Sequence, residues 1–446
     1  MSGYAEYREV NLPWLKAVPA HWEIQRNKNI FTEQKEIVGE RSADYTLLSL
    51  TLNGIIPRDM DGGGKFPESF DKYKIVKNGD MAFCLFDIDE TPRTVGLSGY
   101  NGMLTGAYTI MRVSNINARF IYYYYLALDN GKMLRPLYTG LRKTININTF
   151  QSTKVPVPPR EEQDQIVRFL DWKVSNINKL INIKKKEIKA IDALKRSTVS
   201  HAITRGLTAD APMKYSGVKW LGDIPAHWKV TKLRQILHPV SEKNHPEFPL
   251  LSVVREQGVI LRDVEDKEAN HNFIPDDLSG YKVVRKGQFA MNKMKAWQGS
   301  YGVSDYTGIV SPAYFIFDIA FENLEYFHYA IRSKVYVNFF AQASDGIRVG
   351  QWDLQMDKMK EIPFIVPPAD EQIAIVKYIK QALPQYDAAI EKLTEEVAVL
   401  EEYKNKIIAD TVTGKIDVRG IEIPKYEFVD EDTDADNEDG GEEETE

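Results

Sequence analysis

The sequence of 446 residues has only one cysteine and no long apolar run. Its single cysteine, Cys84, can form neither an internal disulfide nor a cluster of thiolate metal ligands. No run approaches the roughly 18 uncharged apolar residues of a membrane span, and the N-terminus has no basic region followed by an apolar one. We therefore expect a cytoplasmic protein with neither a membrane span nor a signal peptide.

Motifs of nucleotide-dependent and metal-dependent catalysis are also missing. Gly-Gly-Gly-Lys-Phe, ending at Phe66, lacks the spacing and the hydroxyl of a phosphate loop. No Asn/Asp-Pro-Pro-aromatic motif of an amino-methyltransferase occurs, and the seven histidines include no His-Glu-x-x-His pair. The sequence therefore predicts no catalytic residue, no metal site and no cofactor of its own.

The acidic net charge comes from one end of the chain. Residues 427–446 contain twelve Asp or Glu and no Lys or Arg, whereas the whole chain carries −7, so the preceding residues sum to +5. Such an acidic segment buries too little apolar surface to fold. We expect residues 421–446 to form a disordered tail behind a mildly basic body.

One pattern of motifs occurs twice. WLKAVPAHWEI at residues 14–24 returns as WLGDIPAHWKV at residues 220–230, an offset of 206. Six further pairs follow in the same order: LLSL and LLSV, NGII and QGVI, YKIVKNGDMA and YKVVRKGQFA, GLSGYNGMLTGAY and GVSDYTGIVSPAY, TGLR and DGIR, VPVPPREEQ and FIVPPADEQ. This order indicates an internal duplication.

Each copy has two parts. Short β-branched and aromatic runs broken by Gly, Asn and Asp predict a mixed α+β domain, and a Pro-Pro pair followed by acidic residues predicts the start of a helix. The expected boundaries are two related domains at 1–157 and 206–366, two helical segments at 158–205 and 367–420, and the tail from 421.

The helical segments share one apolar seam with a period near 3.5 residues. In the first copy it comprises Leu170, Val174, Ile177, Ile181, Ile188 and Ile191. In the second it comprises Ile379, Leu383, Tyr386, Ile390, Leu393, Val397, Leu400 and Ile407. A seam of this period requires a partner helix, which predicts an antiparallel coiled coil between the two segments. The alternative is that each helix packs only on its own domain.

In this order the motifs resemble the specificity subunit of type I restriction-modification systems over residues 1 to about 420. The resemblance rests on Pro19, His21 and Trp22 with Pro225, His227 and Trp228, on the run 292–314, on the segments 158–163 and 367–372, and on the closing ITRGL and TVTGKI. It implies two target recognition domains that each read half of a split DNA sequence. It also implies that the helices fix the gap and dock two methyltransferase subunits. The resemblance further places restriction and translocase subunits in the complex, with S-adenosylmethionine, ATP and Mg on the partners, and gives this chain no catalytic activity.

The two domains differ most after one matched strand. FCLFDIDETPRTV at residues 83–95 occupies the place of MNKMKAWQGSY at residues 291–301. Different side chains on a common framework are what reading two unlike half-sites requires, so we expect an asymmetric target. The candidate contacts are Arg93, Thr94, Lys293, Lys295 and Gln298, and the alternative for each is an ordinary surface residue.

A Gly-x-Arg motif returns in both copies. It ends at Arg142, with Lys143 and Asn146 following, and at Arg348, with Gln351 following. A recurring guanidinium suits the DNA backbone better than a base edge, although a structural salt bridge is the competing account. The repeated His-Trp pairs, by contrast, are interpreted as packing residues because no nucleophile recurs with them.

Two other classes of protein remain open from the sequence. A self-contained nuclease or methyltransferase is disfavoured by the missing motifs, and modification of DNA by the chain alone would establish it. A coiled-coil adaptor that does not bind DNA would show no affinity for duplex at any ionic strength.

Overall fold

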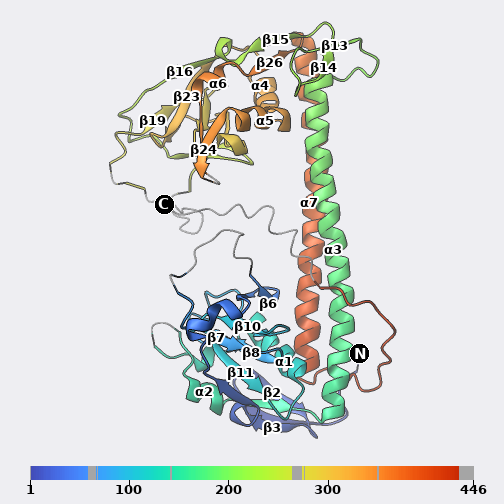
Figure 1. Ribbon diagram of the computed structural model, residues 1–446. Coiled ribbons are helices and arrows are strands. Elements are labelled where there is room, and N and C mark those ends of the chain that lie inside the picture. Colours follow the sequence, from blue (N-terminus) through green and yellow to red (C-terminus); the bar gives the residue numbers. More distant parts are fainter. Residues whose placement is uncertain are drawn as a thin grey trace. The chain divides into compact units, whose positions relative to one another are not determined.

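The computed structural model describes residues 2–58, 67, 69–140, 143–263, 274–275, 277–348 and 351–430. These residues form two compact units. Of the described residues, the first unit contains the chain up to Lys186 together with 394–430, and the second contains Glu187–Leu393. Each unit therefore has a globular part, called the head here, and one half of each of two long helices (Figure 1).

Both heads are α+β and repeat one order of elements. The first has β1 (Tyr7–Leu12), β2 (Leu15–Pro19), β3 (Glu23–Arg26), β4 (Phe31–Gln34), β5 (Leu48–Thr51), β6 (Gly54–Pro57), β7 (Lys74–Val76), β8 (Asp80–Phe83), β9 (Val95–Leu97), β10 (Gly102–Leu104), β11 (Thr109–Val113), α1 (Ala118–Asn130), α2 (Ile147–Ser152) and β12 (Lys154–Val157). The second has β13 (Met213–Tyr215), β14 (Asp223–Pro225), β15 (Lys229–Lys232), β16 (Leu237–Val240), β17 (Leu251–Val254), β18 (Gly258–Leu261), β19 (Lys282–Val284), β20 (Phe289–Asn292), β21 (Tyr301–Val303), β22 (Gly308–Val310), β23 (Tyr314–Ile319), α4 (Leu324–Ile331), α5 (Lys334–Gln342), β24 (Ser344–Arg348), β25 (Gln351–Leu354), α6 (Met356–Lys360) and β26 (Pro363–Val366).

The pairing of strands confirms the duplication. The four-stranded sheet β4-β11-β8-β9 of the first head corresponds to β16-β23-β20-β21 of the second, and all of these pairs are antiparallel. Glycine recurs where the backbone leaves no room for a side chain. A Cβ on Gly102 would lie 2.4 Å from the carbonyl oxygen of Thr46, and one on Gly308 would lie 2.5 Å from that of Pro249.

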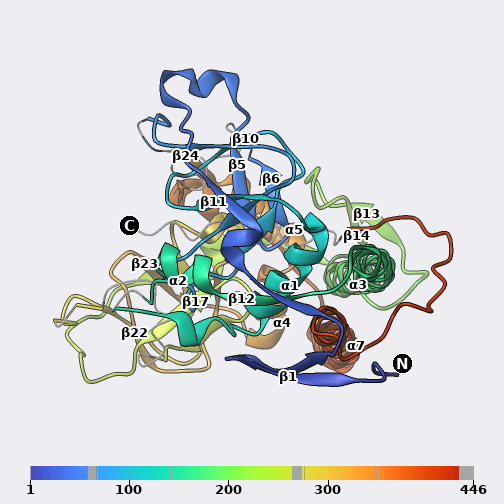
Figure 2. The ribbon, with the colours of Figure 1, turned by 90° about the horizontal axis from the view of Figure 1, so that it is seen from below.

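The two long helices are α3 (Arg160–Arg205) and α7 (Ala369–Val412). Each begins just after its Pro-Pro pair and has acidic residues in its first turn, which complement the helix dipole. Pro384 lies inside α7. Figure 2 shows both helices nearly end-on.

In each unit, a half of α3 lies beside a half of α7 in antiparallel orientation. In the first unit Lys184 forms an ion pair with Glu396, and Lys404 donates to the side chain of Asn178 over 3.4 Å. In the second unit Lys195 Nζ lies 2.5 Å from Asp387 Oδ1. The predicted seam residues lie inward, with Leu170, Ile181 and Ile379 fully buried and the others buried or half-buried. The predicted antiparallel pairing of helices is confirmed.

The helices also pack against the heads. Leu170, Ile177, Ile181 and Ile407 belong to the hydrophobic core of the first head, and Ile379 belongs to that of the second. The two accounts offered by the sequence are therefore both realised, because each helix half contacts its partner helix and a head at once.

A repeated contact attaches each head to the helices. Trp22 is buried and donates its indole N–H to Glu162 Oε1 over 2.9 Å, while His21 Nε2 lies 2.8 Å from the other oxygen. Trp228 and His227 contact Glu371 in the same way, at 2.9 Å and 2.5 Å. Both glutamates lie in the first helical turn, where the dipole favours a carboxylate.

The same tryptophans meet the end of the other helix. Gly414, just after α7, has φ +75°, and a Cβ there would lie 2.4 Å from Pro19 and 3.2 Å from Trp22. Gly206, just after α3, has φ +72°, and a Cβ there would lie 3.0 Å from Trp228. The glycines of TVTGKI and ITRGL therefore provide a left-handed backbone and room for an indole ring. Each tryptophan sits where one helix begins and the other ends.

The segment 421–430 differs from the prediction of a tail disordered from residue 421. It has no helix or strand, yet it is bound to α3 by several hydrogen bonds. Ser175 donates to the carbonyl of Glu427 over 3.0 Å, and Asn182 donates to that of Asp430 over 2.9 Å. Polar side chains of α3 thus satisfy the extended backbone, a signal that composition does not carry. Residues 431–446 lie outside the described part of the chain.

Candidate nucleic-acid interface

In the first head, the variable loop lies against the Gly-x-Arg hairpin. Thr139 and Thr144 exchange backbone hydrogen bonds of 2.9 and 3.1 Å, which closes a tight hairpin. Lys143 Nζ lies 3.4 Å from Asp89 in the loop that follows β8, and Arg135 donates to the same carboxylate over 3.1 Å. The loop and the hairpin therefore form one surface.

Several cations and a hydroxyl converge on Asp89. Burial acts to raise the pKa of this carboxyl, but hydrogen bonds from Arg135, Tyr138 and Lys143 outweigh it and hold the pKa below its usual value. Arg135 remains 65% exposed while it makes this contact. Asp89 orients the cationic side chains of the hairpin.

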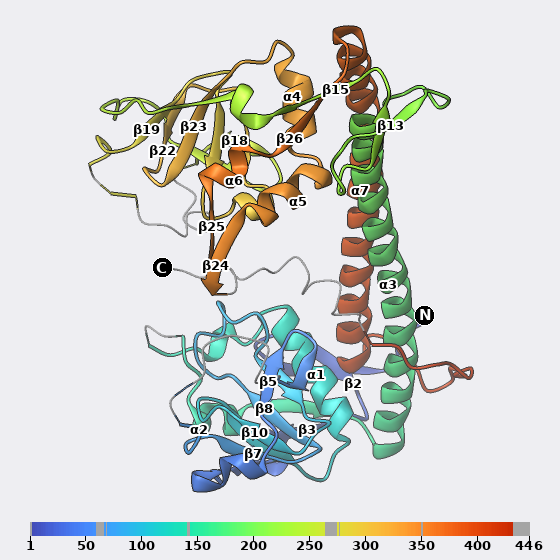
Figure 3. The same ribbon diagram turned by 45° about the horizontal axis from the view of Figure 1, so that its top comes forward.

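The second head repeats this arrangement with different side chains. Lys293, in the loop after β20, lies 2.8 Å from Asp353 of the β24–β25 hairpin, and the Leu354 N–H donates to the carbonyl of Lys293 over 3.3 Å. The rings of Trp297 and Trp352 pack with centroids 5.2 Å apart. Figure 3 shows β24 and β25 at the margin of the second head.

Two predicted DNA contacts have structural roles instead. Thr94 is buried and donates its hydroxyl to Asp129 Oδ1 over 2.7 Å. Arg93, whose side chain is 14% exposed, donates to the same carboxylate over 3.1 Å and to Asn130 over 2.7 Å. The buried charge of Asp129 requires these donors, so the expectation that Arg93 and Thr94 contact DNA is corrected.

The other predicted contacts divide by how fully the structure describes them. Arg142 lies outside the described residues, and Arg348 and Gln351 are placed at the ends of β24 and β25 by their backbones only. Lys295 is exposed. Asn146 is exposed as well, but its side chain accepts from the Asn148 N–H and caps α2. Gln298 borders a cavity of the second unit.

In both heads, other residues that join the loop to the hairpin were not identified from the sequence. Asp89, Arg135 and Tyr138 join the loop and hairpin of the first head, and Trp297 and Trp352 do so in the second. The tryptophans carry a signal, because neither has a tryptophan at the matching place in the first copy. Asp89, the acidic loop residue, has no signal in composition or spacing that would identify it.

The described residues contain neither a metal-binding cluster nor a membrane-spanning helix. No group of three or more His, Cys, Asp or Glu in this part of the chain is placed to hold a metal ion. None of its helices is both long and apolar enough to cross a membrane.

Residues 71–190 match the family described as Type I restriction modification DNA specificity domain. The Type I restriction enzyme MjaVIII specificity subunit of Methanocaldococcus jannaschii is 24% identical over 446 residues, covering 93% of this chain and 98% of its own length. The Putative type I restriction enzyme MjaX specificity subunit of the same organism is 24% identical over 377 residues, covering 79% and 81%.

A solved structure concerning complex assembly and conformational transition of the type I R-M system contains a chain with the same fold. Its TM-score is 0.57 at 13% identity, over 90% of this chain and 99% of that one. The resemblance and the fold class expected from the repeated motifs are confirmed. The chain is similar to the specificity subunits of type I restriction-modification systems.

Proposed function

We propose that this chain is the sequence-specific DNA-recognition subunit of a type I restriction-modification complex. In this proposal the two target recognition domains are residues 1–157 and 206–366. The observation that carries it is the repeated pairing of a variable loop with a Gly-x-Arg hairpin, one in each head. Phosphate contacts position a protein on DNA, so the groups that make them are expected to recur in both heads. Base contacts read the sequence, so the loop side chains that make them are expected to differ.

Each head reads one half of a bipartite target, and the halves are unlike. The first surface carries acidic and cationic groups around Asp89, whereas the second carries Lys293, Lys295 and a tryptophan pair. Arg142, Arg348 and Gln351 remain the proposed contacts of the hairpins, Lys143 is proposed beside Arg142, and Asn146 and Gln298 border the two surfaces.

The helical segments 158–205 and 367–420 fix the gap between the half-sites and dock two methyltransferase subunits. Support for docking comes from apolar side chains that α3 and α7 expose outside their seam, namely Leu180, Ile183, Leu194, Ile373, Tyr378, Val399 and Tyr403. Exposed apolar groups on the paired helices can be covered by a protein partner.

Chemistry in this proposal belongs to the partners. The methyltransferase subunits bring S-adenosylmethionine, and the restriction and translocase subunits bring ATP and Mg. This chain supplies double-stranded DNA recognition in the cytoplasm without a catalytic group of its own.

Sequencing of methylated host DNA at single-molecule resolution tests the proposal. We expect one asymmetric motif of two half-sites with a constant gap, and we expect its methylation to vanish when the gene for this chain is deleted and return when the gene is restored. Unchanged methylation in the deletion strain would contradict the proposal.

A further inference from the structure

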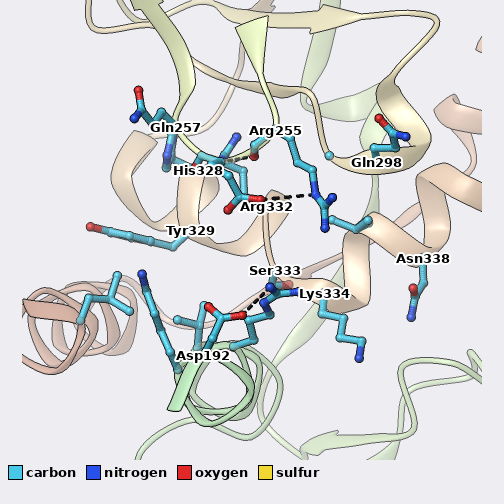
Figure 4. Close-up of a pocket in the computed structure, with 17 residues that line it drawn as sticks. Asp192, Arg255, Gln257, Gln298, His328, Tyr329, Arg332, Ser333, Lys334 and Asn338 are labelled. Atoms are coloured by element: carbon cyan, nitrogen blue, oxygen red, sulfur yellow. Dashed lines mark hydrogen bonds and ion pairs between the residues drawn. The ribbon is translucent and has the colours of Figure 1, made fainter. Parts of the chain in front are cut away.

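A cationic cavity lies within the second unit, between the C-terminal half of α3 and the head. Its volume is about 470 Å³, which is within the usual range for small-ligand sites. Its lining includes Arg196 of α3, Arg255 of the β17–β18 turn and the segment Arg332–Lys334, where α4 ends and α5 begins (Figure 4). Such a lining suits a small anion.

Ser333 stands at the N-cap of α5, which has nine residues, but does not cap it. Its backbone has the usual extended N-cap conformation, with φ −64° and ψ 153°, yet its side chain makes no capping hydrogen bond. The residue is only 4% exposed, and its hydroxyl has no partner among the described residues although it borders the cavity. A buried hydroxyl without a partner requires an explanation, and a ligand oxygen would supply one.

The charges of the lining favour an anion. Lys195, Arg196, Arg255, Arg332 and Lys334 contribute five positive charges, and the two negative ones come from Asp192, which pairs with Arg196, and Glu256, which pairs with Arg255. The first turn of α5 adds backbone N–H groups and the positive end of its dipole. Together these features form a cationic cradle around one uncapped helix end.

Two further lining residues, Arg332 and His328, hydrogen-bond to neighbouring backbone. Arg332 donates to the carbonyls of Arg255 and Glu256 over 2.8 Å each, which fixes the β17–β18 turn. His328 accepts from the Val303 N–H over 3.3 Å, and burial lowers the pKa of His328 to about 4, so that its ring is neutral near pH 7. Arg332 and His328 therefore connect α4 and the residue after it to the β17–β18 turn and to β21 beside the cavity.

The first unit has no equivalent of this cradle among its described residues. The N-caps Asn117 and Asn323 correspond at the offset of 206, so Arg332, Ser333 and Lys334 correspond to Leu126, Ala127 and Leu128. There α1 continues without a break, whereas α4 ends at Ile331 and α5 begins at Lys334. At this place the second copy thus differs from the first by a helix break, a hydroxyl and two cations.

We propose that this cavity binds a phosphate group, held by the Ser333 hydroxyl, the N–H groups at the start of α5 and the side chains of Lys334, Arg196 and Arg255. The phosphate belongs either to a mononucleotide, for which the volume suffices, or to the backbone of bound DNA. The site does not depend on which bases the heads read.

Isothermal titration of the purified full-length chain with sodium phosphate, ADP and a short duplex of arbitrary sequence tests this site. Ser333→Ala and Lys334→Ala remove groups of the cradle, while Lys286→Ala removes an exposed lysine outside it. We expect each cradle variant to weaken phosphate binding at least about tenfold and the control to bind as the parent does. Thermal melting establishes that each variant is folded.

The probes distinguish the two sources. Tighter binding of ADP than of inorganic phosphate, reduced by both cradle variants, assigns the site to a nucleotide. A loss confined to duplex binding, with free phosphate competing, assigns it to the DNA backbone. Equal binding of every probe by the parent and both cradle variants, or no binding of any probe, would overturn the proposal. Either result leaves the methylation test of the proposed function unaffected.

Discussion

Two tryptophans, Trp22 and Trp228, carry the connection between the heads and the helices. Each donates its indole N–H to a glutamate in the first turn of a long helix and packs against a left-handed glycine that follows the other helix. A charge-assisted hydrogen bond inside a packed contact is stronger than a neutral one at the surface. The repeated His-Trp pair is thus explained by packing around a carboxylate.

Replacing Trp22 with Phe removes one of the donors to Glu162, whose side chain is 5% exposed. We expect the free energy of unfolding to fall by about 2–4 kcal/mol, because a buried carboxylate loses one charged hydrogen bond and part of an aromatic contact. Urea denaturation followed by circular dichroism measures this change. Trp220→Phe is the matched control, since Trp220 is 62% exposed and its replacement should alter stability by less than about 0.5 kcal/mol. Equal losses in the two variants would show that the indole–carboxylate contact has no special weight.

His328 gives the second unit a dependence on pH. Burial lowers its pKa from 6.5 to about 4 in the folded chain, so the unfolded chain binds more protons between these values. The contribution of the neutral His328 ring to the free energy of unfolding is complete above about pH 6.5. It decreases as the pH falls toward 4, by roughly 2 kcal/mol at pH 5.

His328→Asn keeps an acceptor for the Val303 N–H but does not titrate in this range. The fall in stability between pH 7.5 and pH 5 should therefore be smaller in this variant than in the parent chain, measured by denaturant unfolding at both pH values. Parallel pH profiles would refute the assignment to His328.

Sequence alone predicted the type of role for some residues and not for others. His21 and Trp22 were predictable as packing residues because they recur beside apolar motifs, but their glutamate acceptor lies 140 residues away in the chain. Arg93 and Thr94 looked like DNA contacts because they occupy a variable loop. Only the fold brings the buried Asp129 beneath them, which gives both a structural partner.

At the scale of elements, the paired helices are the best-predicted feature. Their seam repeats at the period of a coiled coil, and the predicted positions are buried or half-buried while Leu180 and Leu194 are exposed. The break between α4 and α5 was not predictable, because Arg332–Lys334 interrupt a helical pattern without a proline or glycine. Tertiary packing decides such positions.

A comparison of Ile181→Ala with Leu180→Ala tests which face of α3 forms the seam. Ile181 is fully buried in the core that the helices share with the first head, so we expect a loss of about 2–4 kcal/mol. Leu180, the adjacent residue, is 49% exposed, and Leu180→Ala should change stability by no more than about 0.5 kcal/mol. Thermal and urea unfolding of both variants give the comparison. A comparable loss in both would mean that the helix face is assigned wrongly.

At the scale of the whole molecule, we propose that one duplicated chain carries two unlike recognition surfaces on one pair of helices. Repetition of the sequence predicted the number of heads and the pairing of the helices, because the landmarks of the two copies recur in the same order at nearly the same offset. It did not predict which side chains face the nucleic acid, since the hairpins and loops meet only through contacts distant in the chain, such as Lys143 with Asp89.

The most direct test inserts one heptad into both helices, after Lys189 in α3 and after Lys392 in α7, and maps methylated bases in the host. Seven residues lengthen a helix by about 10 Å, which corresponds to about three base pairs of duplex. The account predicts that both half-sequences stay the same while the gap between them widens by about three base pairs. Altered half-sequences with an unchanged gap would contradict it.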